Sequence, residues 1–312
     1  MSDDLLTAQE AADYLKLKKS TVYEMIKRGE IPSAKIGKQL RINRADLEAL
    51  LPGGGHAVPQ REKPPVKPPR PSHEGSGHSS IVLCGQDASL DLIANHVTGI
   101  QGNKAVVLRS HAGSYNSLTM LYHGKVDVAA AMLWHEKTAS YNRPYVETLL
   151  PGMPTVAVRL FGRPVGIFVR QSNPKGIFGL GDLRRRDVTL VNRERGSEAR
   201  VLLDEKLKAM GLAQSAVRGY GNEQTTPLTA AAAVARGEGD MAVGDEASGR
   251  QVSGVDFLPL QTEWCDMVFL AEREQEPAFQ AILDYVLSES FARDLSQSAG
   301  YDLSQTGRVF RL

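Results

Sequence analysis

Cysteine is scarce in this sequence, and Cys84 and Cys265 are the two that occur among 312 residues. Each lies in an apolar run, so we expect two buried free thiols and exclude a disulfide-stapled fold. Long apolar runs are also missing, since none approaches the roughly 20 residues of a membrane-spanning helix. The first residues have neither the basic nor the apolar region of a secretory signal peptide. From these absences we expect a cytoplasmic protein.

Neither positive nor negative residues are in large excess, because the sequence contains 37 Lys and Arg and 36 Asp and Glu. The net charge of +1 therefore indicates no class of partner by itself. The sequence also lacks a nucleophile–base pair, a metal-binding spacing and a Walker-type phosphate loop. Asp87 and His111 could be imagined as a catalytic pair, but chance explains them better. We therefore expect no catalytic residue, no metal and no cofactor.

A stretch without apolar periodicity, residues 52–80, divides the chain. It contains three consecutive glycines, repeated prolines and a Gly-Ser end, a composition typical of an extended and partly flexible linker. The sequence therefore predicts a small domain over 1–51, a linker over 52–80 and a large domain over 81–312.

The pattern of the small domain predicts a winged helix-turn-helix. Thr7 and Glu10 have the spacing of a capping box and start a first helix. A second helix is expected from about Lys19 to Arg28, and alternating residues around Gly37-Lys38 predict a hairpin, the wing. Asn43 then caps a third helix.

Basic residues of the small domain concentrate on the second helix and the wing. Nine Lys and Arg lie between positions 16 and 44 against two Glu, whereas the rest of the domain is acidic. Such clustering is typical of a surface that contacts DNA phosphates, so double-stranded DNA is the expected partner. The residues expected at the DNA are Lys19, Ser20, Thr21, Tyr23, Lys27, Arg28, Lys35, Lys38 and Arg41.

The same stretch carries a family resemblance. Residues 5–51 are similar to excisionase-type winged helix-turn-helix domains, which are related to the mercury-resistance-regulator class. The similarity lies in EAADYL of the first helix, STVY of the second, GEIP of the turn, and KIG and RI of the wing. It implies DNA binding through the second helix and the wing. One such domain makes few contacts, so a homodimer or higher homo-oligomer is expected.

The large domain alternates strand and helix patterns, which predicts an α/β fold with a parallel sheet. Strands are expected at IVLCG, AVVLRS, VDVAAAML, DVTLVN and DMAVG. The segment 155–170 is expected to form two strands around Gly162-Arg163-Pro164, and VDFLPL and CDMVFL are expected to form two more.

Strands that cross between two α/β sets predict a two-lobed, hinged binding domain. Lobe I is expected at about 81–160 plus 256–312, and lobe II at about 161–255. Ligands of such sheets lie beyond the carboxyl ends of the strands, which selects a few loops rich in Ser, Thr and Gly at helix starts. The ligand-binding residues expected there are Asp87, Ser89, Ser114, Ser117, Arg195, Gly196, Ser197 and Thr225.

The large domain also resembles a known family, the type 2 periplasmic-binding-protein-like domain of bacterial regulators. That family is related to molybdate- and tungstate-binding proteins. The resemblance covers nearly all of 81–312 and lies in GQDASLDLIA, GSYNSLTMLYHGKVDVAAA, SAGYDLSQTGRVF and, most specifically, VNRERGSEAR. It implies a small anionic ligand, an oxyanion such as molybdate or tungstate, held by hydroxyl and backbone N–H groups.

Two positions depart from that family, which has glycine and threonine where this chain has Glu198 and Ala199. A carboxylate in the first turn of a helix competes for the dipole that an anion would use. Arg193, Arg195 and Arg200 could instead hold a carboxylate in bidentate fashion. A small carboxylate metabolite is therefore an alternative ligand.

Together these features predict a one-component transcriptional regulator that binds DNA through its small domain and a small anionic effector through its large domain. The alternative is an excisionase-like DNA-binding factor whose large domain binds no ligand and serves assembly. An enzyme of molybdenum-cofactor metabolism is disfavoured because the sequence shows no catalytic constellation.

Overall fold

The computed structural model describes residues 5–27, 31–36, 39–44, 47, 80–100, 106–297 and 300–312. Contacts divide the chain into two compact units, Met1–Val66 and Lys67–Leu312, called the small unit and the large unit below. The expected linker lies outside the described residues up to position 79.

The small unit combines a three-stranded antiparallel sheet with helices. Its described elements are β1 (Leu5–Thr7), α1 (Ala8–Leu15), α2 (Lys19–Lys27), β2 (Ala34–Ile36) and β3 (Gln39–Asn43). The expected capping box is confirmed, because Thr7 Oγ1 accepts from the Glu10 N–H and the Glu10 carboxylate accepts from the Thr7 N–H. The expected hairpin is confirmed as the β2–β3 pair, although its turn, Gly37-Lys38, lies outside the described residues.

A strand that the sequence pattern did not predict completes this sheet. β1 pairs with β3, so the strand order is β1-β3-β2. The small core packs beneath it, and its buried members are Ala11, Ala12, Val22, Ile31, Ile42 and Leu47. Most of the expected third helix lies outside the described residues.

The large unit contains many more elements. Its strands are β4 (Ser80–Cys84), β5 (Val106–Ser110), β6 (Val128–Ala131), β7 (Trp134–His135), β8 (Ser140–Tyr141), β9 (Thr155–Arg170), β10 (Leu190–Arg193), β11 (Glu223–Gln224), β12 (Met241–Asp245), β13 (Val255–Leu270) and β14 (Val309–Arg311). Its α-helices are α4 (Ser89–Gly99), α5 (Ser114–Tyr122), α6 (Arg143–Leu149), α7 (Glu198–Ala209), α8 (Pro227–Ala235), α9 (Glu246–Arg250), α10 (Pro277–Val286) and α11 (Glu289–Ser296). Short 3₁₀ turns occur at Glu136–Thr138, Leu180–Arg184, Gln214–Ala216 and Ala271–Arg273.

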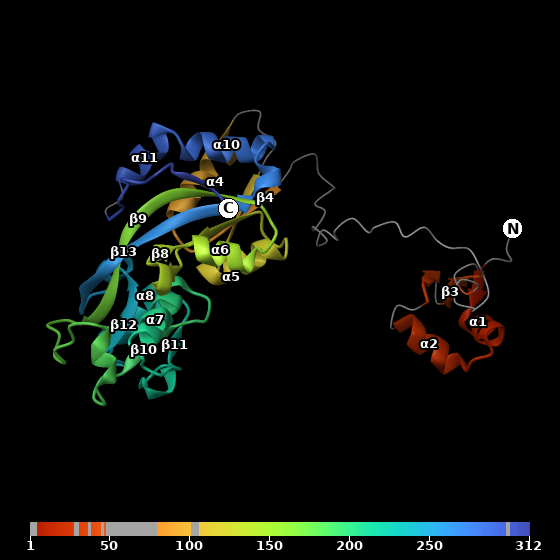
Figure 1. The fold of residues 1–312 in the computed structure, drawn as a ribbon, viewed down its shortest axis with the longest axis horizontal. Coiled ribbons are helices and arrows are strands. Elements are labelled where there is room, and N and C mark those ends of the chain that lie inside the picture. Colours follow the sequence, from red (N-terminus) through yellow and green to blue (C-terminus); the bar gives the residue numbers. More distant parts are fainter. Residues whose placement is uncertain are drawn as a thin grey trace. The chain divides into compact units, whose positions relative to one another are not determined.

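Two long strands, β9 and β13, connect the two halves of the large unit (Figure 1). The main sheet has the order β11-β10-β12-β9-β13-β6-β4-β5, and β14 pairs with the first part of β9. The strands at each end of this sheet pair in parallel. At one end β4 pairs with β5 and β6, and at the other end β10 pairs with β11 and β12. The antiparallel β9–β13 ribbon joins the two parallel parts, so each long strand belongs to both lobes.

The expectation of two strands within 155–170 is wrong, because β9 runs through without a break. β14 pairs with β9 at residues 156–158, and β12 begins to pair with it at Val165. Pro164 lies opposite Thr262 in the β9–β13 ladder, one residue before the β12 pairing starts. β13 is likewise one strand and not two, with register shifts at Pro259/Gln261 and Cys265/Asp266.

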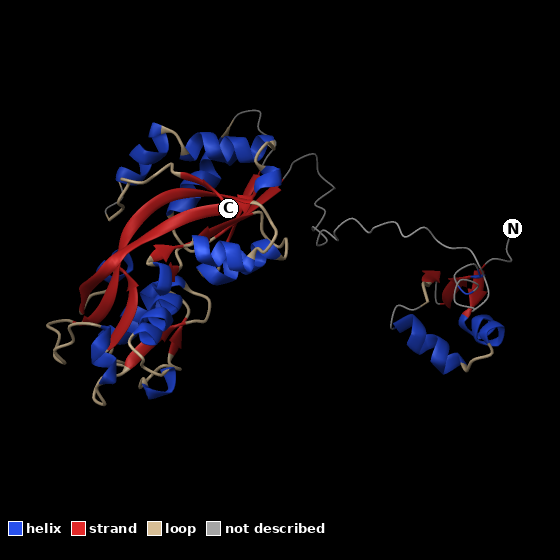
Figure 2. Cartoon of the chain, in the orientation of Figure 1, coloured by secondary structure: helices blue, strands red, loops and turns tan. Residues whose placement is uncertain are grey.

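Helices cover both faces of the large unit's sheet (Figure 2). In lobe I, α4, α10 and α11 pack on one apolar cluster, which includes Phe269 and Phe279, while α5 and α6 pack on another. In lobe II, α7 and α8 contribute to separate clusters. Cys84 and Cys265 are buried and free, as expected. In the part of the chain that the structure describes, no helix has the length and apolarity needed to cross a membrane.

We predict that Gly166→Ala destabilises the large unit, because a Cβ at this position of β9 would lie 2.2 Å from the Leu258 carbonyl oxygen. The expected loss is about 1–3 kcal/mol of unfolding free energy in urea titrations. Gly181→Ala is the control, since its Cβ would meet no atom within 4 Å. An equal loss in both variants would contradict the close approach of β9 and β13.

Candidate functional site

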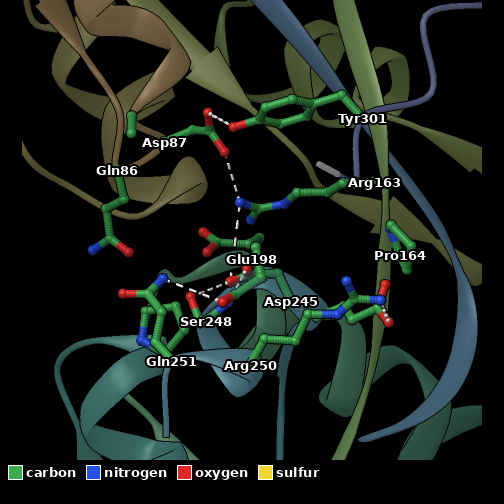
Figure 3. A pocket seen from close by; sticks show the side chains of 15 residues that line it. Gln86, Asp87, Arg163, Pro164, Glu198, Asp245, Ser248, Arg250, Gln251 and Tyr301 are labelled. Carbon is green, nitrogen blue, oxygen red and sulfur yellow. Dashed lines mark hydrogen bonds and ion pairs between the residues drawn. The ribbon is translucent and has the colours of Figure 1, made fainter. Parts of the chain in front are cut away.

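A cavity of about 430 Å³ lies between the two lobes of the large unit. Lobe I contributes the β4–α4 loop and the C-terminal segment, lobe II contributes α7, α8 and α9, and β9 crosses between them. Figure 3 shows the lining side chains converging on this space. They belong to Gln86, Asp87, Ala88, Arg163, Pro164, Glu198, Pro227, Asp245, Glu246, Ala247, Ser248, Arg250, Gln251, Gly300 and Tyr301.

A buried guanidinium, that of Arg163 on β9, organises this cavity. Its Nη1 lies 2.7 Å from Asp87 Oδ2 and 4.0 Å from Asp245 Oδ2, and its Nε lies 2.6 Å from Glu263 Oε1. Asp87 belongs to lobe I and Asp245 to lobe II, so one cation joins carboxylates of both lobes. The Tyr301 hydroxyl donates to the other Asp87 oxygen at 2.9 Å.

The charges of this cluster set the pKa values around it. Burial raises the pKa of Glu263 to about 7, although the Arg163 guanidinium pulls the other way. Burial also acts to raise the pKa of Asp245, but Arg163 and the Ser248 N–H outweigh it and hold that pKa below its usual value. The Arg163 pKa lies well above normal because Glu263, Asp245 and Asp87 outweigh the burial that would lower it.

The lobes also touch beside the cavity, where the start of α5 meets the loop before α7. The Tyr115 N–H donates to the Gly196 carbonyl at 3.0 Å, and the Asn116 amide donates to the Arg195 carbonyl at 3.1 Å. Gly113 permits this approach, because a Cβ there would lie 2.6 Å from the Gly196 oxygen. The lobes are therefore in contact around the cavity.

The serines expected to hold an anion are buried and bonded to the chain itself. Ser197 caps α7, accepting from the Arg200 N–H and donating to the Glu194 carbonyl. Ser114 Oγ lies 3.3 Å from Glu198 Oε2 and accepts from the Met132 N–H. Ser117 Oγ donates to a backbone carbonyl and contacts Cys84 Sγ at 3.2 Å.

The other expected ligand residues are scattered. Ser89 Oγ is buried without a hydrogen-bond partner among the described residues. Arg195 and Thr225 are exposed, and Gly196 contacts α5. Asp87 is the member of the expected set that lines the cavity. The remaining assignments stay predictions.

Two of the arginines considered for a carboxylate ligand, Arg193 and Arg200, pair with carboxylates of lobe II, and Arg193 Nη2 also donates to Gln86 Oε1 of lobe I at 3.0 Å. Arg193 forms a bidentate pair with Glu194, through Nε at 2.7 Å and Nη2 at 2.8 Å. Arg200 is buried against Glu223 and stacks on the Tyr220 ring. Neither guanidinium lines the cavity.

Sequence reasoning missed Arg163, Asp245 and Tyr301 as site residues. Arg163 lies 76 residues from Asp87, so only the folded chain brings them together. A signal was nonetheless present, since Arg163 and Glu263 are charged residues inside long apolar strands. Charged residues in such positions are seldom buried unless they are paired.

Seven of the nine residues expected at DNA lie on α2 or on the wing strands, and the other two lie outside the described residues. Lys19, Ser20 and Tyr23 are exposed on α2, and Thr21 is half-buried there. Lys27 belongs to α2, Lys35 to β2 and Arg41 to β3. Arg28 and Lys38 lie outside the described residues. The exposed side of α2 thus carries polar and basic groups.

Comparisons with known families match both parts of the chain. Residues 5–52 match a helix-turn-helix domain, and residues 99–287 match the PBP superfamily domain. These families are of DNA-binding and binding-protein type. The uncharacterized protein YvgK of Bacillus subtilis (strain 168) is 36% identical over 303 residues, which cover 97% of this chain and 96% of YvgK.

Solved structures share the fold of the large unit at low sequence identity. An ABC-type phosphate transport receptor from Vibrio cholerae aligns with a TM-score of 0.50 at 15% identity, over 72% of this chain and 99% of the receptor. The effector-binding domain of QuiR in complex with shikimate aligns with a TM-score of 0.50 at 14% identity, over 72% and 99% of the two chains. Both similarities confirm the two-lobed fold.

We predict that Glu263→Gln changes how stability depends on pH. Because Glu263 binds its proton more tightly in the folded state, it makes the free energy of unfolding fall as pH rises from about 4.5 to 7. The variant lacks this slope, so its stability relative to wild type should be higher at pH 8 than at pH 5, by up to about 3 kcal/mol.

Urea titrations at the two pH values measure this difference. Glu289→Gln, which alters an exposed side chain of α11, is the matched control and should leave the slope unchanged. A Glu263→Gln variant with the wild-type slope would contradict a raised Glu263 pKa.

Proposed function

The chain belongs to the PBP superfamily, and on this premise we propose that it is a DNA-binding transcriptional regulator whose large unit senses a small ligand. One observation carries the proposal: a helix-turn-helix domain and a two-lobed domain with an interlobe cavity occur in the same chain. The solved QuiR domain, an effector-binding domain in complex with shikimate, supports an effector role for this fold.

The DNA-binding half of the proposal rests on α2 and the wing. Lys19, Ser20 and Tyr23 are exposed on α2, in the position of a recognition helix that enters the major groove. The wing would add contacts to the phosphate backbone through its basic residues. We propose that a homodimer or higher homo-oligomer supplies the contact area that one small domain lacks.

The ligand half rests on the interlobe cavity. When two lobes close on a ligand, their relative position changes. If the DNA-bound protein favours either the open or the closed arrangement of the lobes, ligand binding and DNA binding are coupled. Thermodynamic linkage requires ligand and DNA to change each other's affinity by the same factor. A proline-rich linker transmits little torque, so we propose that coupling acts through oligomerisation in a cytoplasmic, non-enzymatic regulator.

The chemical class of the effector is a separate matter. Molybdate or tungstate remains a prediction from family resemblance, and a small carboxylate remains its alternative. The buried hydroxyls of Ser114, Ser117 and Ser197 are bonded to the chain itself, which gives an oxyanion few free donors. The alternative function, an excisionase-like DNA-binding factor with a ligand-free assembly domain, would bind DNA equally well with and without every small molecule.

We predict that Lys19→Ala weakens DNA binding by the full-length protein. A duplex selected from a random-sequence pool is titrated by fluorescence anisotropy at several salt concentrations. Loss of one phosphate contact should lower affinity at all sequences and reduce the slope of log K against log salt by about 1.

The matched control is Lys125→Ala, which removes an exposed lysine of the large unit. It should leave both the affinity and the salt slope unchanged. Equal behaviour of the two variants, or no sequence enrichment from the pool, would contradict DNA recognition through α2.

A further inference from the structure

The helix N-termini around the interlobe cavity already carry carboxylates of the chain. Asp87 Oδ1 accepts from the Ser89 N–H at the start of α4, at 2.8 Å. Asp245 caps α9 and accepts from the Ser248 N–H and hydroxyl, both at 2.8 Å. Glu198 is the first residue of α7. A helix N-terminus attracts anions, but here an incoming anion would meet a carboxylate at each of the three.

The cations of the cavity are neutralised in the same way. Arg163 is shared by Asp87, Asp245 and the buried Glu263. Arg250 pairs with Glu246 at 2.8 Å. Four carboxylates and two guanidinium groups line the cavity, so negative charge is in excess there.

Among the carboxylates that line the cavity, Asp87, Asp245 and Glu246 each pair with an arginine, whereas Glu198 forms no ion pair among the described residues. It is only 3% exposed and lines the cavity, where Figure 3 shows its carboxylate facing the space below Arg163. Within the described part of the chain its side chain accepts one hydrogen bond, from Ser114 Oγ to Oε2 at 3.3 Å, and forms no ion pair within 4.0 Å, while the Arg163 guanidinium attracts it from farther away. Burying a carboxylate without a cation is costly, so an occupant of the cavity that supplies positive charge would relieve this cost.

We propose that the interlobe cavity binds a small organic cation, a molecule with an ammonium or guanidinium group whose charge partner is Glu198. This inference rests on the proposed function and names the ligand class of the same site. The neutral side chains of Gln86, Ser248 and Gln251 also line the cavity. Each has a hydrogen bond within the chain, to Arg193 and Glu194, to Asp245 and to the Ala247 carbonyl respectively, so a ligand would share these groups with their present partners. A metal ion fits less well, because no three His, Cys, Asp or Glu side chains among the described residues are grouped to hold one.

Thermal unfolding of the full-length protein tests the proposal. The probes are 1,4-diaminobutane, agmatine and arginine methyl ester, set against molybdate, sulfate and succinate at equal concentration and ionic strength. A cation at 100 times its Kd should raise the Tm by about 5 °C, and the anions should not raise it. Failure of all three cations to raise the Tm, or a rise with any anion, overturns the proposal.

The variant Glu198→Gln keeps the acceptor for Ser114 and removes the charge. Its affinity for the stabilising cation, measured by calorimetry, should fall about thirtyfold or more, whereas the exposed Glu147→Gln control should keep wild-type affinity. The ligand-free Glu198→Gln protein should unfold at the same or a higher temperature than wild type. Unchanged cation affinity, or a markedly lower Tm without ligand, overturns the role of Glu198.

These experiments also distinguish a failure of the cation proposal from a failure of the proposed regulatory function. Stabilisation by an anion that changes DNA affinity would end the cation proposal and leave a ligand-sensing regulator. Sequence-specific DNA binding that no small molecule alters, with no probe bound, would overturn both the cation proposal and the ligand-sensing half of the proposed function.

Discussion

The buried ion cluster around Arg163 is the interaction on which the architecture of the large unit depends. One guanidinium on a strand shared by both lobes contacts Asp87 of lobe I, Asp245 of lobe II and Glu263 of the neighbouring long strand. Buried charges are tolerated when each is paired, and removal of one partner leaves an uncompensated charge. The cluster therefore fixes where the two lobes meet and gives the cavity between them its charged walls.

The sign of the cavity's charge follows from how that cluster is built. The fold places helix N-termini at the carboxyl ends of strands, an arrangement that suits anions. In this chain carboxylates occupy the N-termini of α4, α7 and α9, and the two arginines that line the cavity, Arg163 and Arg250, are paired with carboxylates. A fold shared with a phosphate transport receptor can thus present a negative cavity, because the lining side chains, and not the fold, set ligand class.

The sequence predicted what depends on local pattern and could not predict what depends on distant pairing. The Thr7–Glu10 capping box, the wing hairpin and the buried thiols involve neighbouring residues or apolar runs, and each is confirmed. The expectation of two strands around Gly162-Arg163-Pro164 is wrong, because β13, far along the chain, pairs with β9 on both sides of these residues and holds them in one strand. The Arg163 cluster was missed because its partners lie 76 to 100 residues away.

A crystal structure of the full-length protein grown with both 1,4-diaminobutane and sulfate would test the central claim most directly, which is that the interlobe cavity is a site for positive charge. We predict electron density for the diamine between the lobes, with one ammonium nitrogen about 3 Å from the Glu198 carboxylate. Sulfate bound in the cavity, against Arg163 or the start of α7, would contradict this claim.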